Sequence, residues 1–184
     1  MSSSMLLSPL KCVGYALPTP PRPGSWLIDR EVSFIELRMR EPHRTSVLEA
    51  PLQDGEVSLA DTASGSGIQL HLGAAFTRRG SSRAANWLRA AGLDSVDEPL
   101  RFDSRLLLAS PHGWRMCGRL RGARLDAMLV ADADLHDVHT RADGHDAMVM
   151  IASGSIERSP TRDLNDVLLG SRVAVRMHMY LIHG

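Results

Sequence analysis

The chain has 184 residues, 43% of them apolar, and its 21 basic side chains balance 21 acidic ones to a formal net charge of zero. This length and apolar content are typical of one globular domain with a substantial core, which argues against disorder. The balanced charge argues against a nucleic-acid-binding protein, because no overall positive field attracts a phosphate backbone.

The first part of the chain predicts an extended arm over residues 1–24, followed by one folded domain over residues 25–184. The prolines of this arm preclude a helix and remove backbone donors: Pro18, Pro20, Pro21 and Pro23. Its first charge, Lys11, follows the early apolar residues, and Pro9 interrupts them, unlike a secretory signal. No window holds the roughly eighteen apolar residues of a transmembrane helix. We therefore expect a cytoplasmic protein without a transmembrane segment.

Five stretches of the domain alternate between apolar and polar residues, which is the period of a strand with one buried face. They cover residues 33–40, 68–72, 100–106, 114–120 and 173–181. The positions that we expect to face inward are Ile35, Leu37, Met39, Ile68, Leu70, Leu72, Leu100, Phe102, Ser104, Leu106, Trp114, Met116, Gly118, Leu120, Val173, Val175, Met177, Met179 and Leu181.

Turn signals separate these stretches at Asp54-Gly55, at Pro111–Gly113, at Gly122 and at Asp143-Gly144. Two further runs, 125–133 and 147–152, are apolar on both faces, and we expect them under a helix or at a subunit contact, so a homodimer is left open. With about seven or eight strands on short connections, the sequence predicts an all-β, antiparallel barrel or sandwich.

One segment has the pattern of a helix, over residues 81–92, with a second short helical turn expected over 161–169. The segment 132–146 is predicted to be a lengthened polar loop. Its histidines, His136, His139 and His145, have the spacing of a zinc or iron site, but a loop does not fix them in place. We predict no metal, no cofactor and no catalytic residue, since no Gly-x-Ser-x-Gly elbow presents a nucleophile.

The order of these parts resembles the YceI-like polyisoprenoid-binding family. The stretches that carry the resemblance are Trp26-Leu-Ile-Asp29 with Ser33, Pro99-Leu-Arg-Phe-Asp-Ser104, Trp114-Arg-Met-Cys-Gly-Arg-Leu-Arg-Gly122, and Ile156-Glu-Arg-Ser159 before a long last strand. Val32 stands where the family often has a histidine, and the threonines that accompany the family's Gly122 are missing. These departures mark a divergent member.

The resemblance implies an antiparallel, lipocalin-like barrel of about eight strands whose apolar lumen holds a long small molecule, such as a polyisoprenoid, a quinone or a similar lipid. The expected ligand-binding residues are Ile35, Leu37, Leu70, Phe102, Ser104, Trp114, Met116, Val175, Met177 and Met179. An alternative is a barrel enzyme that holds a polyene or polyketide-like chain for cyclisation or isomerisation. An interior carboxylate at Asp126, Asp132 or Glu157 would favour that alternative.

Overall fold

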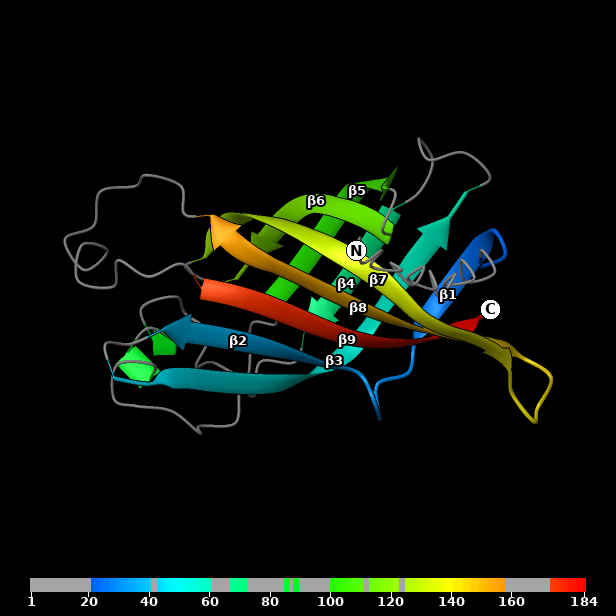
Figure 1. The fold of residues 1–184 in the computed structure, drawn as a ribbon, viewed down its shortest axis with the longest axis horizontal. Helices are drawn as coiled ribbons and strands as arrows, with labels where there is room; N and C mark the ends of the chain where they lie inside the picture. Colours follow the sequence, from blue (N-terminus) through cyan, green and yellow to red (C-terminus); the bar gives the residue numbers. More distant parts are fainter. Residues whose placement is uncertain are drawn as a thin grey trace, which may run out of the picture.

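The computed structural model describes residues 21–40, 43–60, 67–72, 85–86, 88–89, 100–110, 113–122, 125–157 and 173–184. It confirms the predicted all-β, antiparallel class (Figure 1). The strands are β1 (Gly24–Ile28), β2 (Phe34–Arg40), β3 (Thr45–Leu59), β4 (Gly67–Leu72), β5 (Leu100–Ser110), β6 (Gly113–Arg121), β7 (Asp126–Thr140), β8 (Asp146–Glu157) and β9 (Val173–His183).

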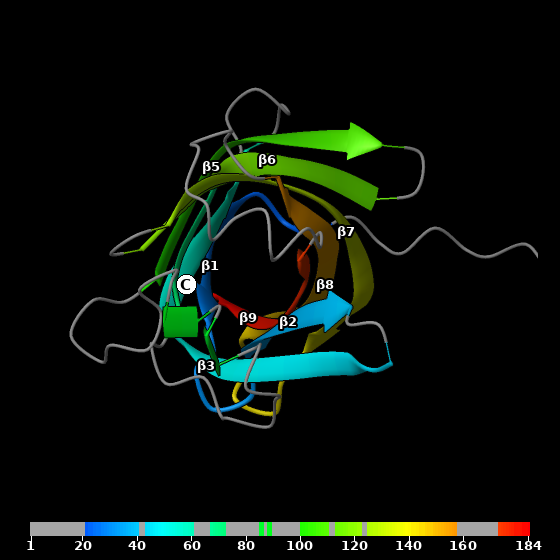
Figure 2. The same cartoon turned by 90° about the vertical axis from the view of Figure 1, so that its left-hand side faces the viewer.

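The sheet closes on itself into a barrel, which Figure 2 shows end-on. Pairing runs without a break from β3 through β4, β5, β6, β7 and β8 to β9. Both β1 and β2 then pair with β9 on one side and with β3 on the other. Because β1 and β2 share one place in the ring, nine strands make a barrel of eight positions. Closure removes the exposed edges that an open sheet would present.

The short connection between β1 and β2 is held to the wall by one serine. The Ser33 hydroxyl accepts a hydrogen bond from the backbone N–H of Tyr180 (2.9 Å) and lies 3.3 Å from the Tyr180 carbonyl oxygen, to which it donates. The Asp29 N–H also donates to that carbonyl, at 2.8 Å. A side chain thus replaces the ladder bonds that are lost where the strand is interrupted.

The turn predicted at Asp54-Gly55 is wrong, because both residues lie inside the continuous strand β3. The pairing of β3 with β4 shifts register between Leu52 and Asp54, which lets the strand continue through these two residues. Pro51 lies at the end of the pairing with β2, beside the β1–β2 connection, where a missing backbone donor is tolerated. A similar register shift in β5, between Ser104 and Leu106, places Leu107 opposite Met116.

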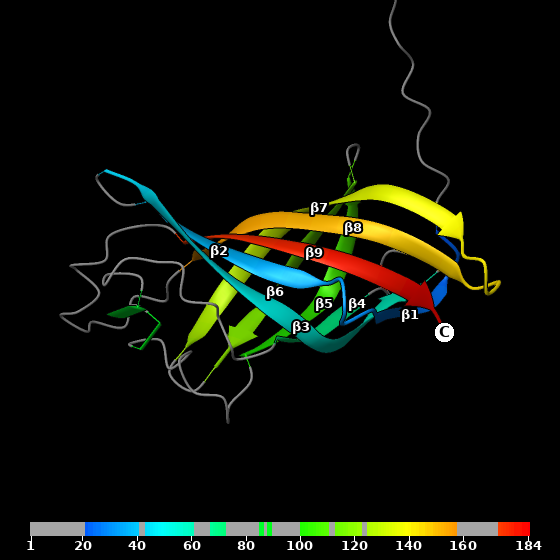
Figure 3. The same ribbon diagram turned by 90° about the horizontal axis from the view of Figure 1, so that it is seen from below.

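The polar loop predicted over 132–146 is also wrong, since β7 continues to Thr140 and β8 begins at Asp146. Only a tight turn joins them, with Gly144 at a φ of 86°. The Thr140 hydroxyl donates to the Asp146 carboxylate at 2.8 Å across its base. The doubly apolar runs are therefore parts of the long strands β7 and β8, which lie beside β9 along the barrel (Figure 3).

Several predictions fall on residues outside those described. The arm is described only from residue 21, and the helical turn over 161–169 not at all. Of the helix predicted over 81–92, residues 85–86 and 88–89 have helical backbone, and Leu88 packs in the main apolar cluster.

Candidate functional site

The interior of the barrel is lined by the apolar residues that alternate along its strands. Of the ten predicted site residues, eight are buried there: Ile35, Leu37, Phe102, Ser104, Met116, Val175, Met177 and Met179. Trp114 is partly buried and packs against this cluster. Leu70 lies opposite Phe102 in the β4–β5 pairing, but its side chain is outside the described part.

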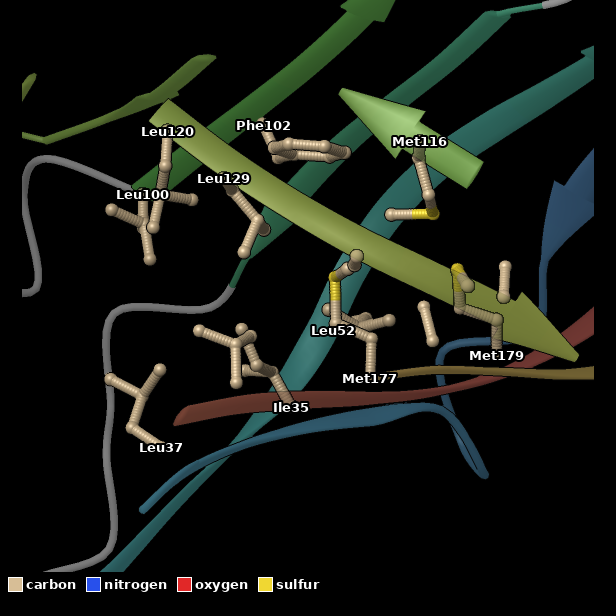
Figure 4. Close-up of a cluster of buried hydrophobic side chains, with 14 of the residues drawn as sticks. Ile35, Leu37, Leu52, Leu100, Phe102, Met116, Leu120, Leu129, Met177 and Met179 are labelled. Carbon is tan, nitrogen blue, oxygen red and sulfur yellow. The ribbon is translucent and has the colours of Figure 1, made fainter. Parts of the chain in front are cut away.

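The two halves of the interior differ in the shape of their side chains (Figure 4). Toward the ends of β7 and β9 the lining is rich in unbranched methionine, and Figure 4 labels Met116, Met177 and Met179 there. The buried Met148 and Met150 lie opposite Leu181 and Met179 in the β8–β9 pairing. Toward the other end it is mostly branched: Leu37, Leu48, Leu100, Leu120, Leu129, Ile156, Val173 and Val175. Methionine adapts to irregular apolar shapes, whereas branched side chains pack in fewer conformations.

Small residues line the wall between these halves. Ala131 pairs with Gly154, and Ala133 pairs with Ala152, on the adjacent strands β7 and β8. All three alanines are buried. At these four positions the wall therefore leaves the interior volume to side chains from other parts of the barrel.

The interior at Gly118 is filled by a neighbouring side chain. A Cβ atom on Gly118 would lie 2.7 Å and 2.8 Å from two carbons of the Phe102 ring. The ring thus occupies the place of a side chain at this position. The Ser104 hydroxyl donates to the Cys117 carbonyl oxygen at 3.0 Å, so it serves the backbone.

Within the described ranges, the buried polar side chains are three serines, Ser33, Ser46 and Ser104. Ser33 and Ser104 both bond to backbone groups of neighbouring strands. The interior therefore presents hydrocarbon and thioether surface, which suits an apolar molecule and offers a charged group no partner.

Trp26, the bulkiest fully buried side chain, lies at the end of the barrel where β9 finishes. Its indole N–H donates to the Arg22 carbonyl oxygen at 3.0 Å. The His183 ring meets the Trp26 ring edge-on at 4.9 Å between centroids, and its Nε2 lies 3.3 Å from the Pro23 carbonyl oxygen. Gly24 has a φ of 135°, and a Cβ there would lie 2.7 Å from the His183 Nε2 atom. Residues 22–24 are thus held against Trp26 and His183 by these contacts.

The predicted site omits several lining residues: Trp26, Leu48, Leu52, Leu129, Met148 and Met150. Those on β3 were missed because Pro51 and Asp54-Gly55 resemble a loop. The alternation of Ser46, Leu48, Ala50 and Leu52 was the signal that could have identified them.

Two of the three carboxylates that would favour an enzyme, Asp126 and Asp132, lie on the outer face. Asp132 pairs with Arg115 at 2.8 Å, and Asp126 pairs with Arg119 at 2.8 Å. The hydrogen bond from Arg115 holds the pKa of Asp132 below its ordinary value. The side chain of Glu157 is outside the described part. Neither aspartate is therefore placed to act as an acid or base inside the barrel.

Of the three histidines expected in a loop, His136 and His139 lie on β7, and His145 lies in the turn before β8. His139 lies 2.9 Å from the Asp137 carboxylate through Nδ1 and 3.1 Å from the Tyr180 hydroxyl through Nε2. This chain of contacts bridges β7 and β9 on the outer face. The described residues contain no group of three or more His, Cys, Asp or Glu side chains that could hold a metal ion.

Comparison with known proteins supports the fold. The structure is similar to that of the Campylobacter jejuni YceI protein, with a TM-score of 0.55 and 14% identity over 72% of this chain and 83% of that one. Burkholderia cenocepacia BcnA gives a TM-score of 0.53 and 9% identity, over 85% and 99% of the two chains. No protein-family model and no curated protein matches the sequence.

The chain therefore has the YceI-like barrel fold that the order of its motifs implied. A polyisoprenoid binding domain from Saccharophagus degradans, described as implicated in plant cell wall breakdown, is more distant, with a TM-score of 0.45 and 12% identity over 89% and 100% of the two chains. No helix in the described ranges is long and apolar enough to span a membrane.

Proposed function

We propose that this protein binds a long apolar small molecule, of the polyisoprenoid or quinone type, inside its barrel and carries or sequesters it. The observation that carries the proposal is a closed ring of strands whose described interior holds apolar side chains and three serines. Each methylene of a ligand that leaves water for such surroundings contributes about 0.8 kcal/mol. A long tail can therefore bind tightly with few polar contacts.

The length of the barrel supports a long ligand rather than a compact one. The inward apolar residues of β7 run from Ala127 to Val138, a stretch of about 35 Å along the strand at the usual rise. The inward residues of β8 and β9 extend the apolar lining along this direction.

The interior residues are buried, so a ligand enters when side chains or an end of the barrel move. The methionine-rich half is the part best able to do so, because each methionine has several low-energy conformations. We therefore expect association to be slow and the bound ligand to contact Met148, Met150, Met177 and Met179.

The direct test is native mass spectrometry of the purified full-length chain, followed by organic extraction and identification of any released molecule. We expect an apolar molecule to leave with the extract and to rebind to the stripped protein. Failure of any apolar molecule to co-purify or to bind the stripped protein would contradict the proposal.

A pair of matched variants places the ligand. Ala152→Leu adds bulk inside the barrel, whereas Ala174→Leu adds the same bulk on the exposed face of β9. We expect Ala152→Leu to weaken binding and Ala174→Leu to leave it unchanged. Because overpacking costs about 1–3 kcal/mol, circular dichroism must show that Ala152→Leu is folded. If Ala152→Leu does not fold, the smaller change Ala152→Val replaces it. Equal ligand affinity of the inner and the outer variant would show that the ligand does not bind inside the barrel.

A further inference from the structure

The zero net charge of the chain conceals an uneven distribution of its described side chains. The end of the barrel opposite Trp26 carries exposed arginines at the ends of β2, β3, β5 and β6, which we name the basic rim: Arg40, Arg44, Arg101, Arg119 and Arg121. The described acidic side chains nearest to them on β5 and β7 are Asp103 and Asp126. Asp126 pairs with Arg119, and Asp103 lies 3.9 Å from Arg121.

Two arginines of this rim face each other. Arg101 and Arg121 are directly opposite in the β5–β6 pairing, so their side chains leave the sheet on the same face. Like charges at such positions destabilise a sheet. An anionic partner that lies against both guanidinium groups would remove this repulsion.

At the opposite end of the barrel, acidic side chains outnumber basic ones along the β7–β8 turn and the adjoining strand ends. Its β7–β8 turn and strand ends carry Asp137, Asp143 and Asp146, against Arg22 and Arg141. Arg22 is bound to Asp146 at 3.1 Å, and Arg141 to Asp143 at 3.3 Å. Trp26 is buried at this same end, and the basic rim surrounds the opposite one.

The basic rim adjoins apolar surface, both inside and outside the barrel. Met39 and Leu120 line the interior next to Arg40 and Arg121 along their strands. On the outer face, Met128 pairs with Arg119 and is 43% exposed. Basic side chains beside exposed apolar ones are typical of surfaces that rest on a bilayer.

We propose that the basic rim docks the barrel on an anionic lipid bilayer, with this end of the barrel against the headgroups. The rim supplies the charge that attracts an anionic surface, and Met128 contacts the interface. In this orientation one end of the barrel faces the bilayer, from which a water-insoluble ligand would be taken up. The inference rests on the proposed function for its purpose, but membrane binding itself needs no ligand.

The test is co-sedimentation of the full-length protein with vesicles of phosphatidylcholine alone and of phosphatidylcholine with phosphatidylglycerol. We expect binding to the anionic vesicles only, and weaker binding as salt screens the charges. Arg101→Gln with Arg121→Gln should weaken partition roughly thirty-fold, since each arginine near an anionic surface contributes about 1 kcal/mol. Because this double change relieves a repulsion, thermal unfolding should show a folded protein.

The matched control removes two arginines from the far end, through Arg22→Gln with Arg141→Gln. It should bind anionic vesicles as the natural protein does. Equal losses in the two double variants, or equal binding to both kinds of vesicle, would overturn the proposal. So would loss of binding in inorganic diphosphate at matched ionic strength, which would instead indicate a discrete anion site. Mass spectrometry of the same samples for ligand separates failure of docking from failure of ligand binding.

Discussion

The inner and outer faces of the barrel come from the same strands but are held together differently. On the inner face, side chains such as Phe102 fill the places left by small residues such as Gly118, and almost every residue is withdrawn from water. On the outer face, ion pairs such as Arg115–Asp132 join exposed side chains across neighbouring strands. Burying an apolar side chain contributes far more to the free energy of unfolding than an exposed ion pair does. Most of the stability of the barrel therefore comes from its inner face, and the outer face can make contacts with other molecules.

The largest effect is expected at the centre of the inner face. Phe102→Ala removes a fully buried ring and leaves a cavity above Gly118, which should cost about 3–5 kcal/mol in the free energy of unfolding. Urea denaturation followed by circular dichroism measures it. A loss below about 1 kcal/mol would show that the interior relaxes around the cavity and that the packing described here does not control stability.

A smaller loss is expected from adding one methyl group at Gly118. The Cβ of Gly118→Ala would collide with the Phe102 ring and the Asp103 carbonyl oxygen, and such overpacking costs about 1–3 kcal/mol. Gly184→Ala is the matched control, because a Cβ at that terminal residue has no neighbour closer than 3.7 Å. Equal melting temperatures for the two variants would contradict the close fit at Gly118.

The outer face contributes a pH dependence through His178. Its ring stacks on Phe34 at 4.3 Å between centroids, and partial burial, with a contribution from Arg176, lowers its pKa from the ordinary 6.5. The unfolded chain therefore takes up the proton first as pH falls, so the stability present above pH 6.5 declines below that value.

We expect the natural protein to lose stability between pH 7 and pH 5, and His178→Phe to lose less of it over the same interval. Denaturation at several pH values measures the difference between the two proteins. Parallel pH profiles would indicate that His178 has the same pKa in the folded and unfolded states.

The smallest effect is expected at the exposed ion pair. Asp132→Asn removes the carboxylate that pairs with Arg115, but both side chains are more than half exposed. Solvent and salt screen such a pair, so the melting temperature at physiological salt should stay within experimental error of the natural value. A clear drop would mean that the outer face stabilises the barrel more than its exposure suggests.

The period-two pattern of the sequence was enough to predict the strands that carry most of the lining. Apolar residues of these strands alternate with charged or polar ones, as at Ile35, Leu37, Phe102, Met116 and Met177. The hydrophobic effect then determines which face of each strand is buried. The order of these strands and their motifs also predicted the barrel class, which the structural comparison supports.

Only the tertiary structure decided the features in which one strand depends on another. Asp54 and Gly55 resemble a turn, but pairing with His71 and Leu70 of β4 keeps them in β3. The polar segment around His136 and His139 resembles a loop, but pairing with β8 extends β7 through it.

The uneven distribution of charge is decided in the same way. Composition records only that arginines and acids balance, whereas the register of β5 and β6 brings Arg101 opposite Arg121. Local residue preferences set which face of a strand is buried, but long-range backbone pairing sets where each strand ends and which residues become neighbours.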